Sequence, residues 1–232
     1  MIRRTCSDSN QTSRPTQKVV PSPSRKQCPY DISVESAAKL RKRVSNAVAR
    51  RDYSHAIAIL NRLLTLYPGQ AEDYSNRGLI YLWNGQPQKA LLDFNKAIEL
   101  APSLASSYNN RANYYATQGA RESAIEDYDR AIDLNPFHVR ARINRAVTLR
   151  ELNCYDAALD GFEEALVFRQ LIGEIYAERG RTYHLRGDWN GAIADYRRAL
   201  TVFQTPSDTK APARHPRWQQ ITNWLNQLQP AS

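Results

Sequence analysis

The feature that most constrains this chain is an internal repeat of 34 residues. One alanine recurs at the same place in five successive lines of that length. The lines are residues 37–70, 71–104, 105–138, 139–172 and 173–206. Position 20 of each line holds, in order, Ala56, Ala90, Ala124, Ala158 and Ala192. Tandem repetition at this period predicts that each line forms one small unit, which buries its apolar face by stacking on the next.

Within each line, two sets of side chains predict two helices. Positions 4, 8 and 11 form the first set and positions 20, 24 and 27 the second, so that members recur every three or four residues on one helical face. Small side chains at positions 8 and 20 would let the two helices approach closely. Gly85, Gly119 and Gly187 fall between the sets, where a residue without a Cβ atom can adopt the positive φ that ends a helix. Each line should therefore fold as a helix, a turn and a helix.

The expected ends of the second helices depend on proline. Position 32 of the first three lines is occupied by Pro68, Pro102 and Pro136. Because proline lacks an N–H group and disfavours the α conformation in the residue before it, these prolines should stop the second helix. The last two lines have Gln170 and Gln204 instead. Without a stop at Gln170, we expect the helix through Leu166 to run on towards Leu171, which leaves the angle between lines four and five open.

The period and these residue classes resemble the tetratricopeptide repeat family. The resemblance covers residues 37–206 in five tandem units of a prokaryotic or cyanobacterial style. It implies an all-α fold, a right-handed superhelical solenoid of helix-turn-helix repeats. In that family the concave face binds peptides or folded partners through positions 2, 5, 6, 9, 12 and 13 of the first helices.

Two flanking segments complete the expected domain organisation around repeats at residues 35–206. Residues 1–34 are rich in Ser, Thr, Pro, Gln and basic residues, and such a segment cannot bury enough apolar surface to order itself, so we expect a disordered basic tail. Residues 207–232 contain a polar linker and then apolar side chains on one helical face. These side chains are Trp218, Ile221, Trp224, Leu225 and Leu228. We expect a helix that caps the last repeat; the alternative is a Trp-bearing segment for a partner.

The basic charge of the chain is confined to its N-terminal part. The sequence has 32 Lys plus Arg against 23 Asp plus Glu, a formal net charge of +9. Residues 1–51 carry all of this excess, because residues 52–232 contain 20 basic and 20 acidic side chains. The tail also overlaps the composition of an organellar transit peptide. Because the few, widely spaced cysteines favour a reducing compartment and no apolar run follows Arg3 and Arg4 as in a secretory signal, we expect a cytoplasmic location. If the tail is a transit peptide, the alternative is a plastid or mitochondrion.

No catalytic constellation accompanies the repeats. The four histidines are scattered without metal-ligand spacing, and the three cysteines give neither a disulfide framework nor a C-x-x-C site. A phosphate-binding glycine loop and a nucleophile elbow are also missing from the sequence. We expect no enzymatic activity, no cofactor and no metal site. No apolar run approaches the roughly 18 residues that a membrane helix needs, so no transmembrane segment is expected. The oligomeric state is left open.

The resemblance implies a partner-binding groove that is basic at its start, rich in amides in its middle and mixed in charge at its end. The residues that it assigns to the groove are Arg41, Lys42, Asn76, Leu79, Trp83, Asn109, Asn110, Asn113, Arg140, Ile143, Asn144, Val147, Glu151, Glu178 and Arg181. Among them, Trp83, Leu79, Ile143 and Val147 are candidates for pockets that receive apolar side chains of the partner.

Position 6 of the repeats carries the most specific expectation. Asn76, Asn110 and Asn144 are 34 residues apart and should form a ladder along the groove. Because a carboxamide both donates and accepts hydrogen bonds, the ladder could hold the backbone of an extended ligand. The alternative is that these asparagines serve repeat packing. Some family members clamp a C-terminal carboxylate with cations, but Glu174 and Glu178 stand where cations belong. A chaperone-tail clamp is therefore not expected.

Three functions remain as hypotheses from the sequence. The leading one is a non-enzymatic interaction scaffold or adaptor, which binds an extended peptide or a protein, an acidic one in particular, in the concave groove. A second is an adaptor for nucleic acid or another anionic surface through residues 1–51, since clustered cations bind such surfaces by releasing counterions. A third is an assembly factor or co-chaperone for a multiprotein complex. It rests only on the likeness of these repeat sequences to those of cyanobacterial and plastid repeat proteins, some of which assist photosystem assembly.

Overall fold

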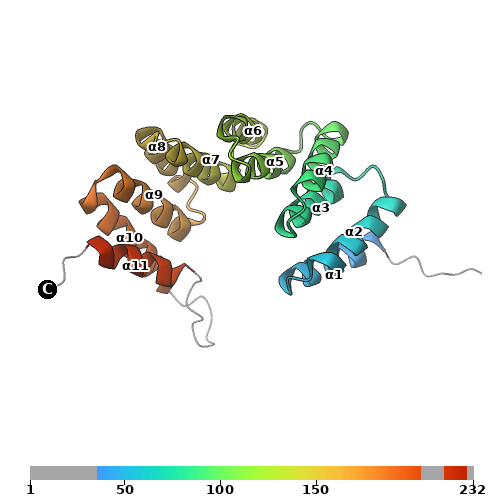
Figure 1. Cartoon of the computed structure of the whole chain (residues 1–232), viewed down its shortest axis with the longest axis horizontal. Coiled ribbons are helices and arrows are strands. Elements are labelled where there is room, and N and C mark those ends of the chain that lie inside the picture. The colour runs from blue at the N-terminus through green and yellow to red at the C-terminus, as the bar shows by residue number, and fades with distance from the viewer. Residues whose placement is uncertain (1–35, 205–216, 229–232) are drawn as a thin grey trace, which may run out of the picture. The chain divides into compact units, whose positions relative to one another are not determined.

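The computed structural model of the protein describes residues 36–204 and 217–228. The predicted tail and most of the predicted linker lie outside the described residues. Every regular element within the described ranges is a helix, so the predicted all-α class is confirmed (Figure 1). In chain order the helices are α1 Ala37–Ala49, α2 Tyr53–Leu66, α3 Ala71–Trp83, α4 Pro87–Leu100, α5 Ala105–Thr117, α6 Arg121–Leu134, α7 Val139–Glu151, α8 Tyr155–Leu166, α9 Ile172–Arg186, α10 Trp189–Gln204 and α11 Trp218–Leu228.

The helices form five successive pairs, which we number as repeats one to five. Each odd-numbered helix from α1 to α9 packs against the next helix in the chain, and each second helix then packs against the first helix of the following pair. α11 packs on α10 in the place that the first helix of another repeat would take. Its Ile221 is fully buried in a cluster with Tyr196 of α10. The apolar core is therefore a series of small clusters along the array.

Side-chain size sets the distance between the two helices of a repeat, as the sequence predicts. A Cβ atom added to Gly78 would lie 2.6 Å from Cε1 of Phe94, and one added to Gly180 would lie 2.9 Å from Cδ1 of Tyr196. Both rings are buried. Glycine at position 8 therefore makes room for the large ring at position 24 of the same repeat.

The turn inside each repeat uses a left-handed residue at position 15. The three predicted glycines have φ of +70° at Gly85, +78° at Gly119 and +90° at Gly187. Repeats one and four use Arg51 at 59° and Asn153 at 61° in the same place. The turn is thus common to all five repeats, and the glycine pattern in the sequence had indicated only three of them.

The second helices end as predicted where proline is present. α2, α4 and α6 each end two residues before the proline at position 32. In repeat four the expectation of a longer helix is wrong, because α8 ends at Leu166 and the chain turns. Arg169 and Leu171 in this turn have φ of 52°, which costs about 1–3 kcal/mol at a residue other than glycine. The turn lets Phe168 and Leu171 pack against the core of repeat four, and this burial offsets the backbone cost.

Bidentate ion pairs link the two helices in three of the five repeats. An arginine at position 7 donates two hydrogen bonds to an aspartate at position 23, with N–O distances between 2.6 and 3.1 Å. The pairs are Arg77 with Asp93, Arg111 with Asp127, and Arg179 with Asp195. All three aspartates are buried. Repeat four keeps the arginine, Arg145, but has Gly161 at position 23.

Candidate partner-binding groove

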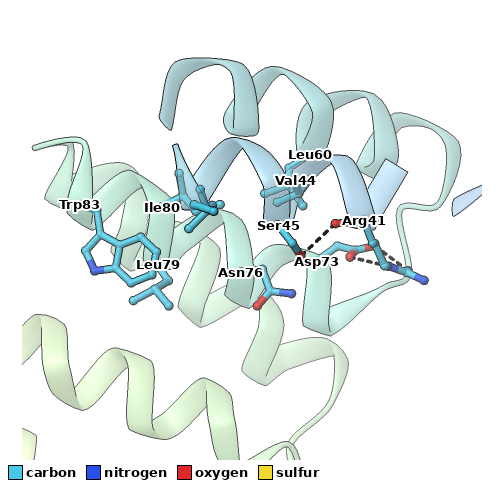
Figure 2. Close-up of a pocket in the computed structure, with 11 residues that line it drawn as sticks. Arg41, Val44, Ser45, Leu60, Asp73, Asn76, Leu79, Ile80 and Trp83 are labelled. Atoms are coloured by element: carbon cyan, nitrogen blue, oxygen red, sulfur yellow. Dashed lines mark hydrogen bonds and ion pairs between the residues drawn. The ribbon is translucent and has the colours of Figure 1, made fainter. Parts of the chain in front are cut away.

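A pocket of about 400 Å³ lies between the first helices of repeats one and two (Figure 2). Its lining includes Arg41 and Ser45 of α1 and Asn76, Leu79 and Trp83 of α3. These five residues stand at positions 5, 6, 9 or 13, which are positions that the family resemblance assigns to the concave face. The floor of the pocket is apolar, because Val44, Leu60 and Ile80 are buried beneath it. The structure therefore brings five residues of adjacent repeats to one hollow.

The apolar end of the pocket is formed by Trp83 and Leu79, which lie beside each other in Figure 2. Trp83 is 50% exposed although its ring leans on Tyr53, with 6.0 Å between the ring centroids. Leu79 is half-buried. A large, half-exposed indole next to a hollow with an apolar floor is typical of a surface that receives an apolar side chain.

The other end of the pocket is polar and held by an ion pair. Arg41 donates from Nε to Oδ1 of Asp73 at 2.9 Å and from Nη2 to Oδ2 at 2.7 Å. The hydrogen bond from Asp73 raises the pKa of Arg41, and burial opposes this only in part. Because Asp73 is fully buried and bound on both oxygens, its charge is compensated. The pocket therefore presents a fixed guanidinium at this end.

Further cations lie on α1 next to this pocket. Lys42 occupies position 6 of repeat one, where repeats two to four have asparagine, and its side chain is exposed. α1 itself contains no acidic residue, and the exposed acid across from it on α3 is Glu72. Lys42 therefore adds an exposed positive charge beside the pocket, whereas the charge of Arg41 is balanced by Asp73.

The middle of the groove differs from the predicted ladder. Asn110 donates from Nδ2 to Oγ of Ser75 at 3.1 Å, and Asn144 donates from Nδ2 to Oδ1 of Asn113 at 2.9 Å. Each bond joins two adjacent repeats, so these carboxamides have a packing role whether or not a ligand binds. Asn76 is the exposed member of the three.

Three residues assigned to the groove are buried: Asn109, Ile143 and Glu178. Asn109 is buried and donates to Oδ1 of its neighbour Asn110 at 3.3 Å. Ile143 is also buried, in the core of repeat four, and contributes only a small surface to the pocket that it lines with Arg140 and Val147. The side chains of Asn109 and Ile143 lie on the expected face of their helices, but adjacent side chains cover most of their surface.

At the C-terminal end, α11 and the residue before it cover the predicted groove. Arg217 donates from Nη1 to Oε1 of Glu178, and Arg150 donates to Oε2 of the same carboxylate at 2.7 Å. The guanidinium of Arg181 lies 5.1 Å from the ring centroid of Trp224. Burial raises the pKa of Glu178, but the two arginines lower it further, and the net pKa lies below its ordinary value. Arg217 could not be predicted from the sequence, because it follows the linker and its position relative to the repeats cannot be derived from the 34-residue period.

A second, smaller pocket of about 170 Å³ is lined by residues of α7 and α9. Arg140, Asn144 and Val147 line it from α7, and Arg217 contributes from the C-terminal segment. Glu151, also on α7, is exposed and accepts a bond from Nε of Arg121 at 3.3 Å. This pocket is charged on both sides, unlike the apolar one between α1 and α3.

Sequence comparisons agree with the repeat architecture. Two family models described as tetratricopeptide repeat match the chain, one over residues 45–112 and the other over residues 105–138. The chain belongs to the tetratricopeptide repeat family. Members of this family are generally non-catalytic modules that bind proteins or peptides. Among curated protein sequences, none matches this tetratricopeptide repeat protein.

Solved structures of other tetratricopeptide repeat proteins share the superhelical repeat fold. TTC0263, a thermophilic protein from Thermus thermophilus, is similar with a TM-score of 0.67 at 19% identity over 83% of this chain and 98% of its own. PilW, a type IV pilus biogenesis factor, has a TM-score of 0.67 at 17% identity over 72% of this chain and 78% of its own. YrrB, which has an unusual peptide-binding site, has a TM-score of 0.53 at 18% identity over 72% of this chain and 87% of its own. Identities this low show the fold alone.

Within residues 36–204 and 217–228, no helix is both long and apolar enough to cross a bilayer.

Proposed function

We propose that this tetratricopeptide repeat protein is a non-enzymatic interaction scaffold, and that the pocket between α1 and α3 receives a bulky apolar side chain from an extended segment of its partner. The observation that carries the proposal is the half-exposed Trp83 beside a 400 Å³ hollow with an apolar floor. The other groove residues contribute polar contacts along the segment.

Magnitudes favour the pocket over the asparagines as the main source of affinity. Burying one large apolar side chain contributes about 1.5–3 kcal/mol. A hydrogen bond contributes about 1 kcal/mol, and Asn110 and Asn144 already use a donor on neighbouring repeats. Micromolar binding needs about 8 kcal/mol. Burial of an apolar side chain and charge attraction therefore have to supply most of the binding free energy that the amides do not provide.

Charge around the pocket favours an acidic partner segment. The charge of Arg41 at the rim is balanced by Asp73, but Lys42 beside it is exposed, and α1 carries no acidic side chain. An exposed cation in these surroundings attracts an acidic segment and speeds its encounter with the groove. The specificity of the site would then combine a bulky apolar residue with neighbouring carboxylates.

A peptide selection with two tryptophan variants tests this proposal. A random peptide library would be selected on the wild-type protein, and the affinity of the best peptide measured for Trp83→Ala and for Trp189→Ala. The two indoles are matched in exposure, at 50% and 53%, but Trp189 lies outside the groove on α10. We expect Trp83→Ala to weaken binding at least thirtyfold, since truncation of an anchoring aromatic costs about 2 kcal/mol or more. Equal affinities for the two variants would move the site away from this pocket.

A second candidate function rests on the helix α1 by itself. Lys42, Arg50 and Arg51 are exposed on or just after this helix. The proposal is an adaptor that holds nucleic acid or another anionic surface through residues 1–51. Its binding would fall steeply with salt, because each neutralised phosphate releases a counterion. A 20-mer of single-stranded DNA titrated at two salt concentrations, with Lys42→Gln and Arg50→Gln as variants, tests it; salt-independent binding would exclude this mode.

A narrower form of the scaffold proposal is a role as an assembly factor or co-chaperone. It requires that the selected partner be a subunit of a larger complex, and that the amount of that complex fall when Trp83 is replaced. The absence of enzymatic activity and a cytoplasmic location are parts of the same proposal, and the sequence features given above are what support them.

A further inference from the structure

Repeat four lacks one half of the ion pair that links the helices of repeats two, three and five. In those repeats the position-7 arginine binds both oxygens of a buried aspartate at position 23. Repeat four retains Arg145 at position 7, but Gly161 at position 23 supplies no carboxylate. The Nε atom of Arg145 is buried without a hydrogen bond in the described part of the chain. It lies 2.5 Å from Oδ1 of Asp129, but in a direction that does not give hydrogen-bond geometry.

A pocket of about 220 Å³ occupies this place. Arg142, Arg145, Gly161 and Glu164 line it together with Asp129 of α6. Arg142 and Arg145 stand at positions 4 and 7 of α7, whereas the groove positions of α7 are 2, 5, 6, 9, 12 and 13. The pocket is therefore built by other positions of α7 than those that the family uses for its groove.

An apolar hollow of about 240 Å³ adjoins this pocket and shares Arg142 and Glu164 with it. Val167 and Phe168 form its apolar side. Val167 is 77% exposed, and Phe137, which is 73% exposed, meets Phe168 edge to face with 5.9 Å between the ring centroids. Such large, exposed side chains gathered in one place mark an interaction surface more often than isolated ones do.

We propose that these two hollows, which we call the repeat-four notch (Arg142, Arg145, Gly161, Glu164, Val167 and Phe168), bind a segment of a partner protein that carries a carboxylate next to a bulky apolar side chain. The carboxylate takes the place of the missing position-23 aspartate on Arg145. The apolar side chain covers Val167 and Phe168. This site is independent of the groove proposed above.

The acidic side chains already at the notch do not block this use. Asp129 is paired with Arg145 and Glu164 with Arg142, and both carboxylates are about half exposed or more. Because the carboxylates are exposed although the arginines are partly buried, displacing them costs less than breaking a fully buried pair such as Arg179 with Asp195. A planar guanidinium prefers a carboxylate that it can bind with two parallel bonds, as its counterparts in the other repeats do.

Three capped dipeptides test the proposal on the full chain. Acetyl-Asp-Phe-amide carries both features, acetyl-Asn-Phe-amide lacks the charge and acetyl-Asp-Ala-amide lacks the large apolar group. Binding would be followed by the NMR signal of the Arg145 Nε–Hε group, which is assigned by its loss in Arg145→Lys. We expect saturable shifts with acetyl-Asp-Phe-amide, at least tenfold tighter than with either of the other two. Equal titrations for the Asp and Asn peptides would overturn the proposal.

Gly161→Asp is the sharpest control. It supplies the carboxylate internally and should abolish the titration, while Trp83→Ala in the groove should leave the titration unchanged. The added Cβ atom would lie 3.2 Å from Cβ of Ala146, a close contact, but repeat three accommodates the same combination of Ala112 and Asp127. If Gly161→Asp does not fold, Ala146→Gly/Gly161→Asp reproduces the combination of repeats two and five. Persistent tight binding by whichever of these two variants folds would refute the assignment of the ligand to Arg145.

Discussion

Replacing Asp195 with asparagine should be among the most damaging single-atom changes in this protein. Arg179 donates to both oxygens of Asp195, at 2.6 and 3.1 Å, and the two side chains are only 10% and 1% exposed. The asparagine side chain would keep one acceptor oxygen but turn an NH₂ group towards the guanidinium. Burial is the largest single influence on the pKa of Arg179 and lowers it, but the hydrogen bond and charge of Asp195, with Tyr183 and Glu163, together hold the pKa above its ordinary value. Arg179 cannot lose its charge in response to the substitution, because a guanidinium stays protonated in proteins.

The expected loss follows from the burial of this pair. Removing one partner of a buried ion pair leaves an uncompensated charge and costs about 3–5 kcal/mol. Glu163 lies 3.5 Å from Nη1 of Arg179 and can take over part of the compensation. We therefore expect Asp195→Asn to lower the free energy of unfolding of the C-terminal repeats by about 3 kcal/mol, the lower end of that range.

Asp156→Asn is the matched control for this substitution. Asp156 also accepts from an arginine, Arg186, at 2.6 Å, but its side chain is 87% exposed. An exposed pair contributes about 0–1 kcal/mol, so this variant should be nearly neutral. Urea unfolding followed by helical circular dichroism gives the overall change. Because repeat arrays do not always unfold in one step, hydrogen exchange of amides in α9 and α10 gives the local change.

A double variant tests whether the uncompensated charge causes the loss of stability. If the uncompensated charge causes it, Arg179→Leu/Asp195→Leu should recover most of the stability, since apolar pairs of similar volume often replace buried ion pairs without loss. Losses that are equal in Asp195→Asn and Asp156→Asn, or a double variant less stable than Asp195→Asn, would refute the reasoning.

Three other substitutions probe the fold at different points. Gly78→Ala should lower the free energy of unfolding by about 1–3 kcal/mol, because its Cβ atom would lie 2.6 Å from the ring of Phe94. The control is Ala112→Gly in repeat three, where an alanine already packs against a tyrosine ring. This substitution should not raise the free energy of unfolding, since there is no overpacking to relieve. Arg51→Gly should raise the thermal midpoint, because it removes the strain of a positive φ of 59°, about 1 kcal/mol, and Asn153→Gly should raise it less since asparagine tolerates this conformation better. Glu178→Gln should reduce the loss of stability on acidification. The folded pKa of Glu178 is lowered, so its carboxylate stabilises the fold at pH values above its unfolded pKa of about 4.3. That stabilisation disappears as the pH falls through the folded pKa. Comparing urea midpoints at pH 7 and pH 3 for the wild type and this variant measures the effect, and identical pH dependence would contradict it.

Helix pairing could be predicted from the sequence because it depends on local periodicity and on side-chain size. The small residues at positions 8 and 20 and the prolines at position 32 act on their own repeat, so their effect can be seen one line at a time. The end of α8 could not be predicted in this way. It depends on the burial of Phe168 and Leu171 against a core to which Val139 and Ile175 contribute from other helices. A missing proline therefore does not imply a longer helix when the residues after it are apolar.

The candidate groove shows a second limit of the same kind. Periodicity assigns Asn110 and Asn144 to one column, but it does not reveal that their donors bind Ser75 and Asn113 in the preceding repeat. Asn109 is likewise on the expected helix and yet buried by its neighbours. Sequence register determines which side of a helix a residue occupies, whereas the distance between repeats decides whether the side chain is free for a ligand. That distance is a tertiary property.

The charge at position 6 changes along the groove. Lys42 is exposed at its start, and Asn110 and Asn144 in its middle bind side chains of the preceding repeat. Glu178 at its end is neutralised by Arg150 and Arg217. The exposed Lys42 therefore attracts an acidic segment towards α1, which is also where the apolar pocket lies. Because α11 and the preceding Arg217 contact Arg181 and Glu178 and not Trp83, loss of this C-terminal segment would uncover a carboxylate without touching the anchor pocket. Substitutions in α11 and at Trp83 should then act additively on partner affinity, as expected for sites that share no contacts.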